Sequence, residues 1–392
     1  MLTDLAIIFI FGIFIALIFE KIGLAPIIGM LIAGIIISPN QMNLVSENIF
    51  NLSNDLRQIA LVVILSRAGL TLNFEKLKKV GRPAILLSFL PATIEMLAII
   101  FLAQRFFNLN VIDAGIMAAV LAAVSPAIVV PRMIKLIDEG YGADKNIPEM
   151  ILAGASVDDV FVIVFFSSFL ALKTGGQLSA MSFINIPISI ITGVIFGIII
   201  GKVFAFIFKK IDINEIYKAM IFISIGFFAL ELQKIIETKI GFSALISIMA
   251  AGMAINQENP KLANELLFSY NRLWKVFELL LFVLVGISVD LAYVKEAGFL
   301  AVILIIIGLI FRMLGVNISL IKTNLNKKER LFTSLAYIPK ATVQAAIGPV
   351  ALQMGLASGN LILSVSVIAI LLTAPLGAIL TDKTYKKLLK KS

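Results

Sequence analysis

The chain contains a long series of separate apolar runs of about 20 residues, and this feature limits its fold more than any other. A helix of about 20 residues crosses the roughly 30 Å hydrocarbon core of a bilayer, because each residue adds about 1.5 Å. Of the 392 residues, 60% are apolar and only 15% are charged, whereas soluble domains have about 25% charged residues. So many apolar runs leave no room for a soluble domain. The sequence therefore predicts an all-α polytopic membrane protein.

We expect about thirteen transmembrane helices. Their expected ranges are 2–19, 22–38, 55–72, 83–106, 112–131, 148–172, 182–208, 216–235, 240–255, 273–290, 298–321, 330–354 and 360–380. Residues 261–272 are expected to lie along the membrane interface, and residues 381–392 to form a short basic tail.

Basic residues in the loops indicate the orientation, because cytoplasmic loops carry an excess of Lys and Arg. The loops after the third, seventh and eleventh spans are basic, whereas loop 39–54 has no Lys or Arg. With an odd number of spans, the basic loops and the tail lie on one side. We therefore predict a protein of the plasma (inner) membrane with its N-terminus outside and its C-terminus in the cytoplasm. The net charge of +9 then faces a membrane surface rather than nucleic acid.

A weak internal repeat indicates how the spans are organised. The segment Gly69-Leu70-Thr71 matches Gly286-Ile287-Ser288, which lies 217 residues later. The match links the third span to the tenth, and this odd separation gives the two copies opposite orientations. An inverted repeat of six plus one plus six spans is an architecture of secondary transporters. We expect repeats over about 1–172 and 216–380, with a linker helix over about 182–208, in a single membrane transporter domain.

Two adjacent aspartates, Asp158 and Asp159, lie in the sixth predicted span. The apolar and aromatic run Val160–Phe166 follows them, which favours a membrane helix over a helix end that dips into water. Two adjacent carboxylates cannot both be ionised cheaply in a low dielectric, so the pair should hold a proton near neutral pH. Sodium, a hard cation that takes oxygen ligands, would relieve the same repulsion. We therefore expect one site for which a cation and protons compete.

The fifth and twelfth spans, again seven apart, are interrupted by prolines at mid-depth. Proline frees backbone carbonyls, which is tolerated in a membrane where the backbone lines a cavity or packs in protein. A corresponding pair of interrupted spans points to a transporter's binding site, although either proline alone could be a simple kink. The residues of interest at these two interruptions are Ser125, Pro126, Pro339, Lys340, Thr342 and Gln344. Lys340 could neutralise half-helix ends or a carboxylate.

Other intramembrane charges come in two kinds. Glu95 and Arg312 are 217 residues apart, so the repeat places them at equivalent depths and suggests a buried ion pair. That pair could lock helices together, take part in transport, or do both. Arg67 and Arg132 lie near span ends, where gating and interfacial roles are both open.

No enzyme constellation is present in the sequence. There is no Cys and no His, which removes soft-metal sites and histidine proton relays. There is no P-loop to hold ATP. We therefore expect a protein without enzyme activity or cofactor, driven by ion gradients.

Several motifs are similar to those of a known family. The segments Ser125-Pro126-Ala127-Ile128-Val129-Val130-Pro131, Gly140-Tyr141-Gly142 and Ala155-Ser156-Val157-Asp158-Asp159 resemble the monovalent cation:proton antiporter superfamily. The runs Arg67-Ala68-Gly69-Leu70 and Pro339–Gly348 are closer still to its NHA-type branch of sodium/proton antiporters. This resemblance covers essentially the whole chain.

The resemblance implies a homodimer in a lipid membrane, in which a six-helix core moves against a dimerisation domain. Two broken helices would cross beside the aspartates, in an elevator-type alternating-access mechanism. By position, Asp158 and Asp159 would carry the cation and the proton, and Arg312 would be the basic residue of the eleventh span, with Glu95 as its partner. Ser125 and Lys340 would lie at the crossing.

We therefore expect an antiporter that exchanges Na⁺ or Li⁺ for H⁺, with Na⁺ held at Asp158 and Asp159. K⁺/H⁺ exchange is an alternative, because carboxylates alone do not select an ion by size. A channel or a non-transporting sensor on the same scaffold is another, although no polar stripe runs through the spans. Two adjacent acids favour an electrogenic cycle with two protons per sodium, whereas the Glu95–Arg312 pair favours electroneutral exchange. We predict the electrogenic cycle.

Overall fold

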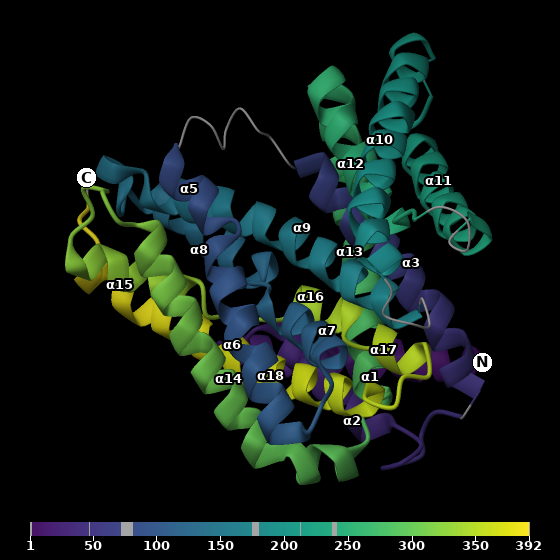
Figure 1. The fold of residues 1–392 in the computed structure, drawn as a ribbon, viewed down its shortest axis with the longest axis horizontal. Coiled ribbons are helices and arrows are strands. Elements are labelled where there is room, and N and C mark those ends of the chain that lie inside the picture. Colours follow the sequence, from purple (N-terminus) through teal and green to yellow (C-terminus); the bar gives the residue numbers. More distant parts are fainter. Residues whose placement is uncertain are drawn as a thin grey trace. The chain divides into compact units, whose positions relative to one another are not determined.

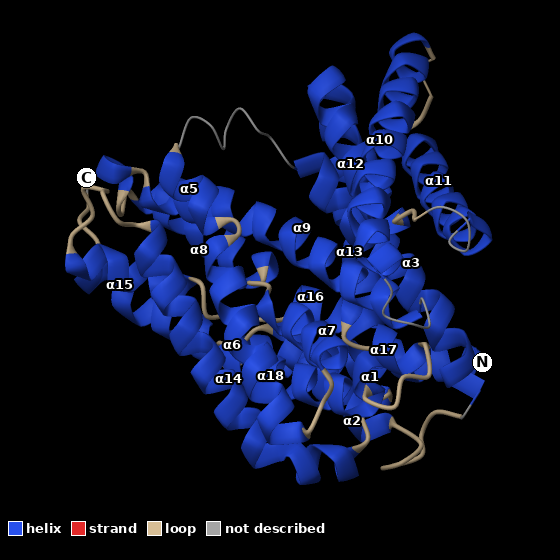
Figure 2. Cartoon of the chain, viewed as in Figure 1, coloured by secondary structure: helices blue, strands red, loops and turns tan. Residues whose placement is uncertain are grey.

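The computed structural model of the chain is helical, as Figure 2 shows. It describes residues 2–46, 48–71, 81–174, 180–211, 213–236 and 241–391. Within these residues, eight helices are long and apolar enough to cross a membrane. The chain therefore has the fold class expected from its apolar runs, an all-helical polytopic membrane protein.

The helices of the first part of the chain can be followed in Figure 1. They are α1 (Leu2–Lys21), α2 (Pro26–Ile37), α3 (Asn48–Thr71), α5 (Arg82–Leu87), α6 (Leu90–Phe107), α7 (Val111–Ala122), α8 (Pro126–Glu139), the 3₁₀ turn η1 (Ala143–Lys145) and α9 (Ile147–Thr174). The remaining helices are α10 (Ala180–Lys210), α11 (Glu215–Ile236), α12 (Ala244–Glu258), α13 (Pro260–Ile287), α14 (Leu291–Ser319), α15 (Lys327–Ala336), α16 (Thr342–Ile347), α17 (Val350–Gln353) and α18 (Gly359–Leu388).

Three expected spans are interrupted: 83–106 forms α5 and α6, 112–131 lies in α7 and α8, and 330–354 forms α15, α16 and α17. Proline stands at the start of α6 and of α8, where its missing N–H costs nothing. The count of thirteen spans and the inverted repeat stay predictions.

Two expected boundaries differ from the observed ones. Helix α13 begins at Pro260, so residues 261–272 belong to the same helix as the following span rather than to a separate interfacial segment. Helix α18 continues to Leu388, beyond the expected end at residue 380. The basic residues Lys76, Lys78 and Lys79, used to orient the chain, lie outside the described residues.

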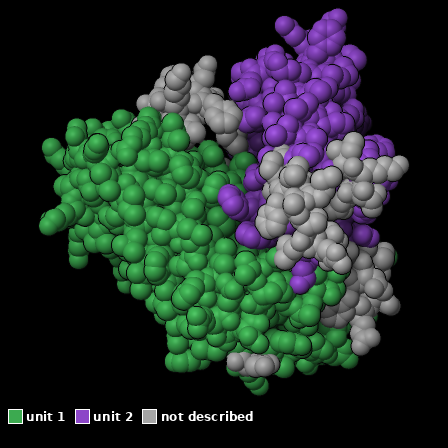
Figure 3. All heavy atoms as spheres, viewed as in Figure 1, with its two compact units in different colours: residues 1–54, 75–162, 279–392 green, residues 55–74, 163–278 purple. Residues whose placement is uncertain are grey.

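The chain forms two compact units, coloured separately in Figure 3. Unit 1 comprises residues 1–54, 75–162 and 279–392, and unit 2 comprises residues 55–74 and 163–278. Three of the four boundaries between them fall inside helices, in α3, α9 and α13.

Within unit 2, glycines allow α10 and α12 to pack closely. A Cβ at Gly193 would lie 2.7 Å from the carbonyl oxygen of Ser243. One and two turns further on, Gly197 and Gly201 lie equally tightly against α12. Small residues at this spacing permit close helix approach in a membrane, where apolar lipid removes the usual hydrophobic drive for association.

Within unit 1, α6 packs along α14 through the same kind of contact. A Cβ at Gly315 would lie 2.6 Å from the Cα of Pro91, and one at Gly308 would lie 3.2 Å from Ile99. This close approach brings Glu95 of α6 to the face of α14 that carries Arg312. Small residues on α14 thus place two charged side chains side by side.

The end of α18 also packs into unit 1 instead of leaving it. Tyr385 and Leu389 are buried in an apolar cluster with residues of α8, α9 and α15. The hydroxyl of Tyr385 donates to Glu139 at 2.9 Å, and the backbone N–H of Gly142 donates to the carbonyl of Lys390 at 2.8 Å. The segment expected as a basic tail is therefore largely helix and is attached to the α8–α9 connection.

This attachment predicts the effect of shortening the side chain of Tyr385. Replacing Tyr385 with Ala should lower the free energy of unfolding by about 3 kcal/mol, because a buried aromatic ring is removed. Lys387→Ala, two residues further on at an exposed position, should change it by less than about 0.5 kcal/mol. Melting temperatures of the detergent-solubilised variants measure both, and equal values for the two variants would show that the segment is not attached.

Candidate ion-binding site

The site begins with the break between α7 and α8. Residues preceding a proline are disfavoured in helical conformation, and Ser125, directly before Pro126, is extended with φ −87° and ψ 111°. Helix α7 therefore ends at Ala122. Its last carbonyls have no partner within the helix.

A second break separates α15 from α16, around Pro339. The two breaks are joined directly, because the backbone N–H of Ser125 donates to the carbonyl of Pro339 at 2.8 Å. The hydroxyls of Ser125 and Thr342 lie 3.4 Å apart. The residues expected at a crossing of two interrupted spans therefore lie together.

The two adjacent aspartates of α9 have different surroundings. Asp158 is fully buried, and its Oδ2 accepts from the backbone N–H of Val124 at 2.8 Å and from Arg312 at 2.9 Å. Asp159 is 7% exposed, and its Oδ1 has no hydrogen-bond partner among the described residues. Thus Asp158 is held in an ion pair, whereas no ion pair of Asp159 is found in the part of the chain that the structure describes.

Arg312 has the central position in the site. It donates from Nη1 to Glu95 at 2.8 Å, from Nη2 to Asp158 and from Nε to the carbonyl of Tyr337 at 2.8 Å. A further hydrogen bond from Nη1 goes to the carbonyl of Ala122, at the end of α7. The guanidinium therefore satisfies two carboxylates and the negative end of a helix dipole at once.

Lys340 and Gln344 complete the end of α7. The Nζ of Lys340 lies 2.7 Å from Glu95 Oε1 and donates to the carbonyl of Leu121. The side-chain amide of Gln344 donates to the carbonyls of Val120 and Ala123 at 3.1 and 3.0 Å. These contacts satisfy the carbonyls that the break leaves free.

The four paired side chains form one continuous series, from Asp158 through Arg312 and Glu95 to Lys340. All are at most 1% exposed. Two carboxylates and two cations balance each other, as buried charges require. Asp159 is the additional acid beside this balanced set.

Arg132 and Arg67, expected near span ends, have charged partners outside this series. Arg132 forms an ion pair with Asp382 at 2.9 Å and donates to the carbonyl of Ile128 at 3.0 Å. Arg67 belongs to unit 2, where its charge interacts with that of Glu278.

The sequence did not indicate several residues that contribute to the site. Tyr337 provides a carbonyl and a ring to Arg312, and Thr373 of α18 accepts from the backbone N–H of Lys340 at 2.9 Å. The only signal for Tyr337 is its position two residues before Pro339. Thr373 has no local signal, because its role comes from packing of a distant helix.

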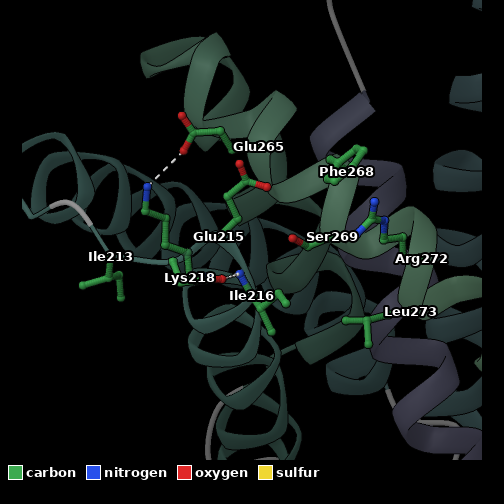
Figure 4. Close-up of a pocket in the computed structure, with 10 residues that line it drawn as sticks. Ile213, Glu215, Ile216, Lys218, Glu265, Phe268, Ser269, Arg272 and Leu273 are labelled. Atoms are coloured by element: carbon green, nitrogen blue, oxygen red, sulfur yellow. Dashed lines mark hydrogen bonds and ion pairs between the residues drawn. The ribbon is translucent and has the colours of Figure 1, made fainter.

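A separate cavity of about 750 Å³ lies in unit 2, at the start of α11 and along α13 (Figure 4). Its lining residues are Ile213, Asn214, Glu215, Ile216, Lys218, Glu265, Phe268, Ser269, Arg272 and Leu273. The charges of Lys218 and Glu265 are paired at 3.0 Å. None of the site residues expected from the sequence lines this cavity.

The buried pair of Glu95 and Arg312 predicts strong coupling between their substitutions. Glu95→Gln should lower the free energy of unfolding by about 3–5 kcal/mol, because the buried cations Arg312 and Lys340 then lose the negative charge that they share. The double variant Glu95→Gln/Arg312→Met should lose clearly less than the sum of the single losses. Thermal unfolding of all three variants measures this coupling.

The matched control is Glu231→Gln, which breaks an exposed pair with Lys234 whose side chains are both 63% exposed. It should cost less than about 1 kcal/mol. Simple additivity of Glu95→Gln and Arg312→Met would rule out the coupling.

Comparisons with known proteins identify the family of this chain. The family model of the transmembrane sodium/hydrogen exchangers matches residues 5–384. Sodium/hydrogen exchanger 9B2 of Homo sapiens is 31% identical over 384 residues, covering 94% of this chain and 70% of the relative. Sodium/hydrogen exchanger 9B1 of Homo sapiens is 30% identical over 391 residues, covering 93% and 73%.

Among solved structures, the sodium proton antiporter MjNhaP1 from Methanocaldococcus jannaschii has the same fold. Its TM-score is 0.84 at 20% sequence identity, and the match covers 98% of this chain and 97% of MjNhaP1. The apolar helices of the described residues and the match over nearly the whole chain point to the same kind of protein. This chain belongs to the transmembrane sodium/hydrogen exchanger family and is a multi-pass membrane protein of the cation/proton antiporters.

Proposed function

We propose that this antiporter exchanges Na⁺ or Li⁺ for H⁺ at the Asp158–Asp159 pair, with Asp159 as the carboxyl group that alternately holds the proton and the cation. The observation that carries this proposal is the series of ion pairs that engages Asp158 and leaves Asp159 without a cationic partner in the described structure. An additional negative charge without a partner in a low dielectric is costly. Asp159 therefore needs either a bound proton or a bound cation.

Oxygen atoms available to a cation support the same assignment. The Oδ1 atoms of Asp158 and Asp159 and the Oε1 atom of Gln344 are buried, and none has a hydrogen-bond partner among the described residues. Such oxygens are the ligands that hard cations prefer. Relatives named sodium/hydrogen exchangers favour Na⁺ over K⁺ as the transported ion and favour a transporter over a channel or a sensor.

We further propose the inverted repeat of about thirteen spans with elevator-type alternating access. Two contacts support the repeat: Glu95 with Arg312 and Ser125 with Thr342 both join residues that are 217 positions apart. A pseudo-two-fold axis through the crossing brings equivalent positions of two halves together in this way. With this repeat we keep the plasma (inner) membrane location, the external N-terminus, the cytoplasmic C-terminus and the homodimer.

The contacts also bear on the charge moved per cycle. The electrogenic cycle expected from the sequence requires both aspartates to release protons, but here Asp158 is paired with Arg312 at 2.9 Å. If Asp158 stays paired, one proton trades for one cation and no net charge moves. Lys340 could add a proton to the count only by losing its own, and it is paired with Glu95 at 2.7 Å. The geometry therefore favours electroneutral exchange over the electrogenic cycle.

The first test of this function is the variant Asp159→Asn. It should abolish cation-dependent proton movement and leave the melting temperature nearly unchanged, because no ion pair is lost. Asp158→Asn should lower the melting temperature as well, because Arg312 loses a partner. Dequenching in everted vesicles, with Na⁺, Li⁺ and K⁺ added in turn, measures both activity and selectivity.

The exposed Asp138 provides the matched control, since Asp138→Asn makes the same chemical change away from the site. It should retain exchange. Cation-dependent proton movement by Asp159→Asn would end the assignment of Asp159, and a response to K⁺ alone would favour the K⁺/H⁺ alternative.

The second test addresses stoichiometry in proteoliposomes with equal sodium on both sides and an imposed potassium diffusion potential. An electroneutral carrier should move no protons when valinomycin is added, beyond the leak of empty liposomes, because its cycle carries no net charge. Proton movement that depends on the protein and on sodium would instead show that Asp158 leaves Arg312 during the cycle, and would restore the electrogenic mechanism.

A further inference from the structure

Tyr337 is a fully buried residue in the break after α15, and it contacts Arg312 in two ways. Its carbonyl accepts the hydrogen bond from Nε at 2.8 Å. Its ring centroid lies 5.5 Å from the guanidinium carbon, within the range of a cation–π interaction. The carboxylates of Glu95 and Asp158 hold the two ends of the same guanidinium. Tyr337 thus contacts Arg312 from a side that no carboxylate occupies.

Gly154 brings the helix of the aspartates against this tyrosine. Gly154 lies one turn before Asp158 on α9, and a Cβ there would collide with the hydroxyl of Tyr337. The next nearest atom is the Cβ of Leu87, at 2.8 Å. The hydroxyl itself has no hydrogen-bond partner among the described residues. The ring therefore fills the space between α9 and Arg312 by shape.

We propose that Tyr337 is a positioning residue that fixes Arg312 between Glu95 and Asp158, with Gly154 setting its distance from α9. This inference rests on the proposed exchange at Asp159. Without the ring, the guanidinium is free to move away from Asp158, because only a backbone carbonyl then holds it on that side. With a side chain at position 154, the ring is pushed towards Arg312.

The consequence for transport follows from the charges that face Arg312. These are Glu95 on α6, Asp158 with its neighbour Asp159 on α9, and Lys340 in the break. Moving the guanidinium away from Asp158 removes the positive charge that offsets the aspartate pair. A carboxyl group must lose its proton before it takes sodium, so exchange should then begin at higher pH.

The experiment compares the pH profile of sodium-dependent proton movement in proteoliposomes. Tyr337→Leu and Gly154→Ala should each shift the acid limb of the profile to higher pH by about half to one unit, as expected for a small displacement of one nearby charge. Adding Tyr337→Phe to Gly154→Ala should reverse at least half of that shift, because it removes the atom with which the new methyl group collides. A general loss of packing would not produce this reversal.

Matched controls come from unit 2. Tyr270 is also fully buried, so Tyr270→Leu removes an equivalent ring, and Gly201→Ala creates an equivalent collision with a neighbouring helix. Both should lower the melting temperature without moving the pH profile. An unchanged profile in Tyr337→Leu and Gly154→Ala, or equal shifts in these controls, would overturn the role of Tyr337.

The outcome for Tyr337 is separable from that for the proposed function. If the wild-type protein moves no protons in response to sodium, the proposed exchange fails. If the wild type is active but Tyr337→Phe does not reverse the Gly154→Ala shift, only the positioning role fails. Where Tyr337→Leu does not fold, the melting temperatures of Gly154→Ala, Tyr337→Phe and the double variant decide, since additive changes would refute the contact.

Discussion

The site depends on the carbonyl groups at the end of α7, which the break before Pro126 leaves without partners in the helix. In lipid no water can satisfy them, so the protein must supply donors. Arg312, Lys340 and Gln344 do so. Two of these donors are cations, and their charge in turn requires Glu95 and Asp158. The broken helix thus determines which acids beside it are neutralised.

The physical origin of each feature explains how much of the fold and of the site could be predicted from the sequence. Apolar runs predict helices in a membrane because length and composition suffice. Prolines predict the breaks because their effect is local. Glu95 and Arg312 were paired by their spacing in a weak repeat. The aspartates were identified because a charged side chain inside a membrane has a high free energy and therefore indicates a functional role.

What the sequence could not provide was the choice between Asp158 and Asp159. They are neighbours in sequence, but successive residues of a helix point in different directions, so only one meets Arg312. Tyr337 was missed for a related reason, because its contact with Gly154 joins positions far apart in the chain. Both facts depend on tertiary packing.

Helix α18 contacts both interrupted segments of the site, the break after α15 and helix α8. Near its middle Thr373 accepts from the backbone of Lys340, and about 13 Å further along the axis Asp382 pairs with Arg132 on α8. The two contacts lie on either side of Pro375 and connect α18 to both interrupted segments that meet at the crossing. For protein engineering, a reporter or affinity handle attached near Lys391 would therefore act on a helix that contacts both of these segments, so it should be joined through a flexible linker.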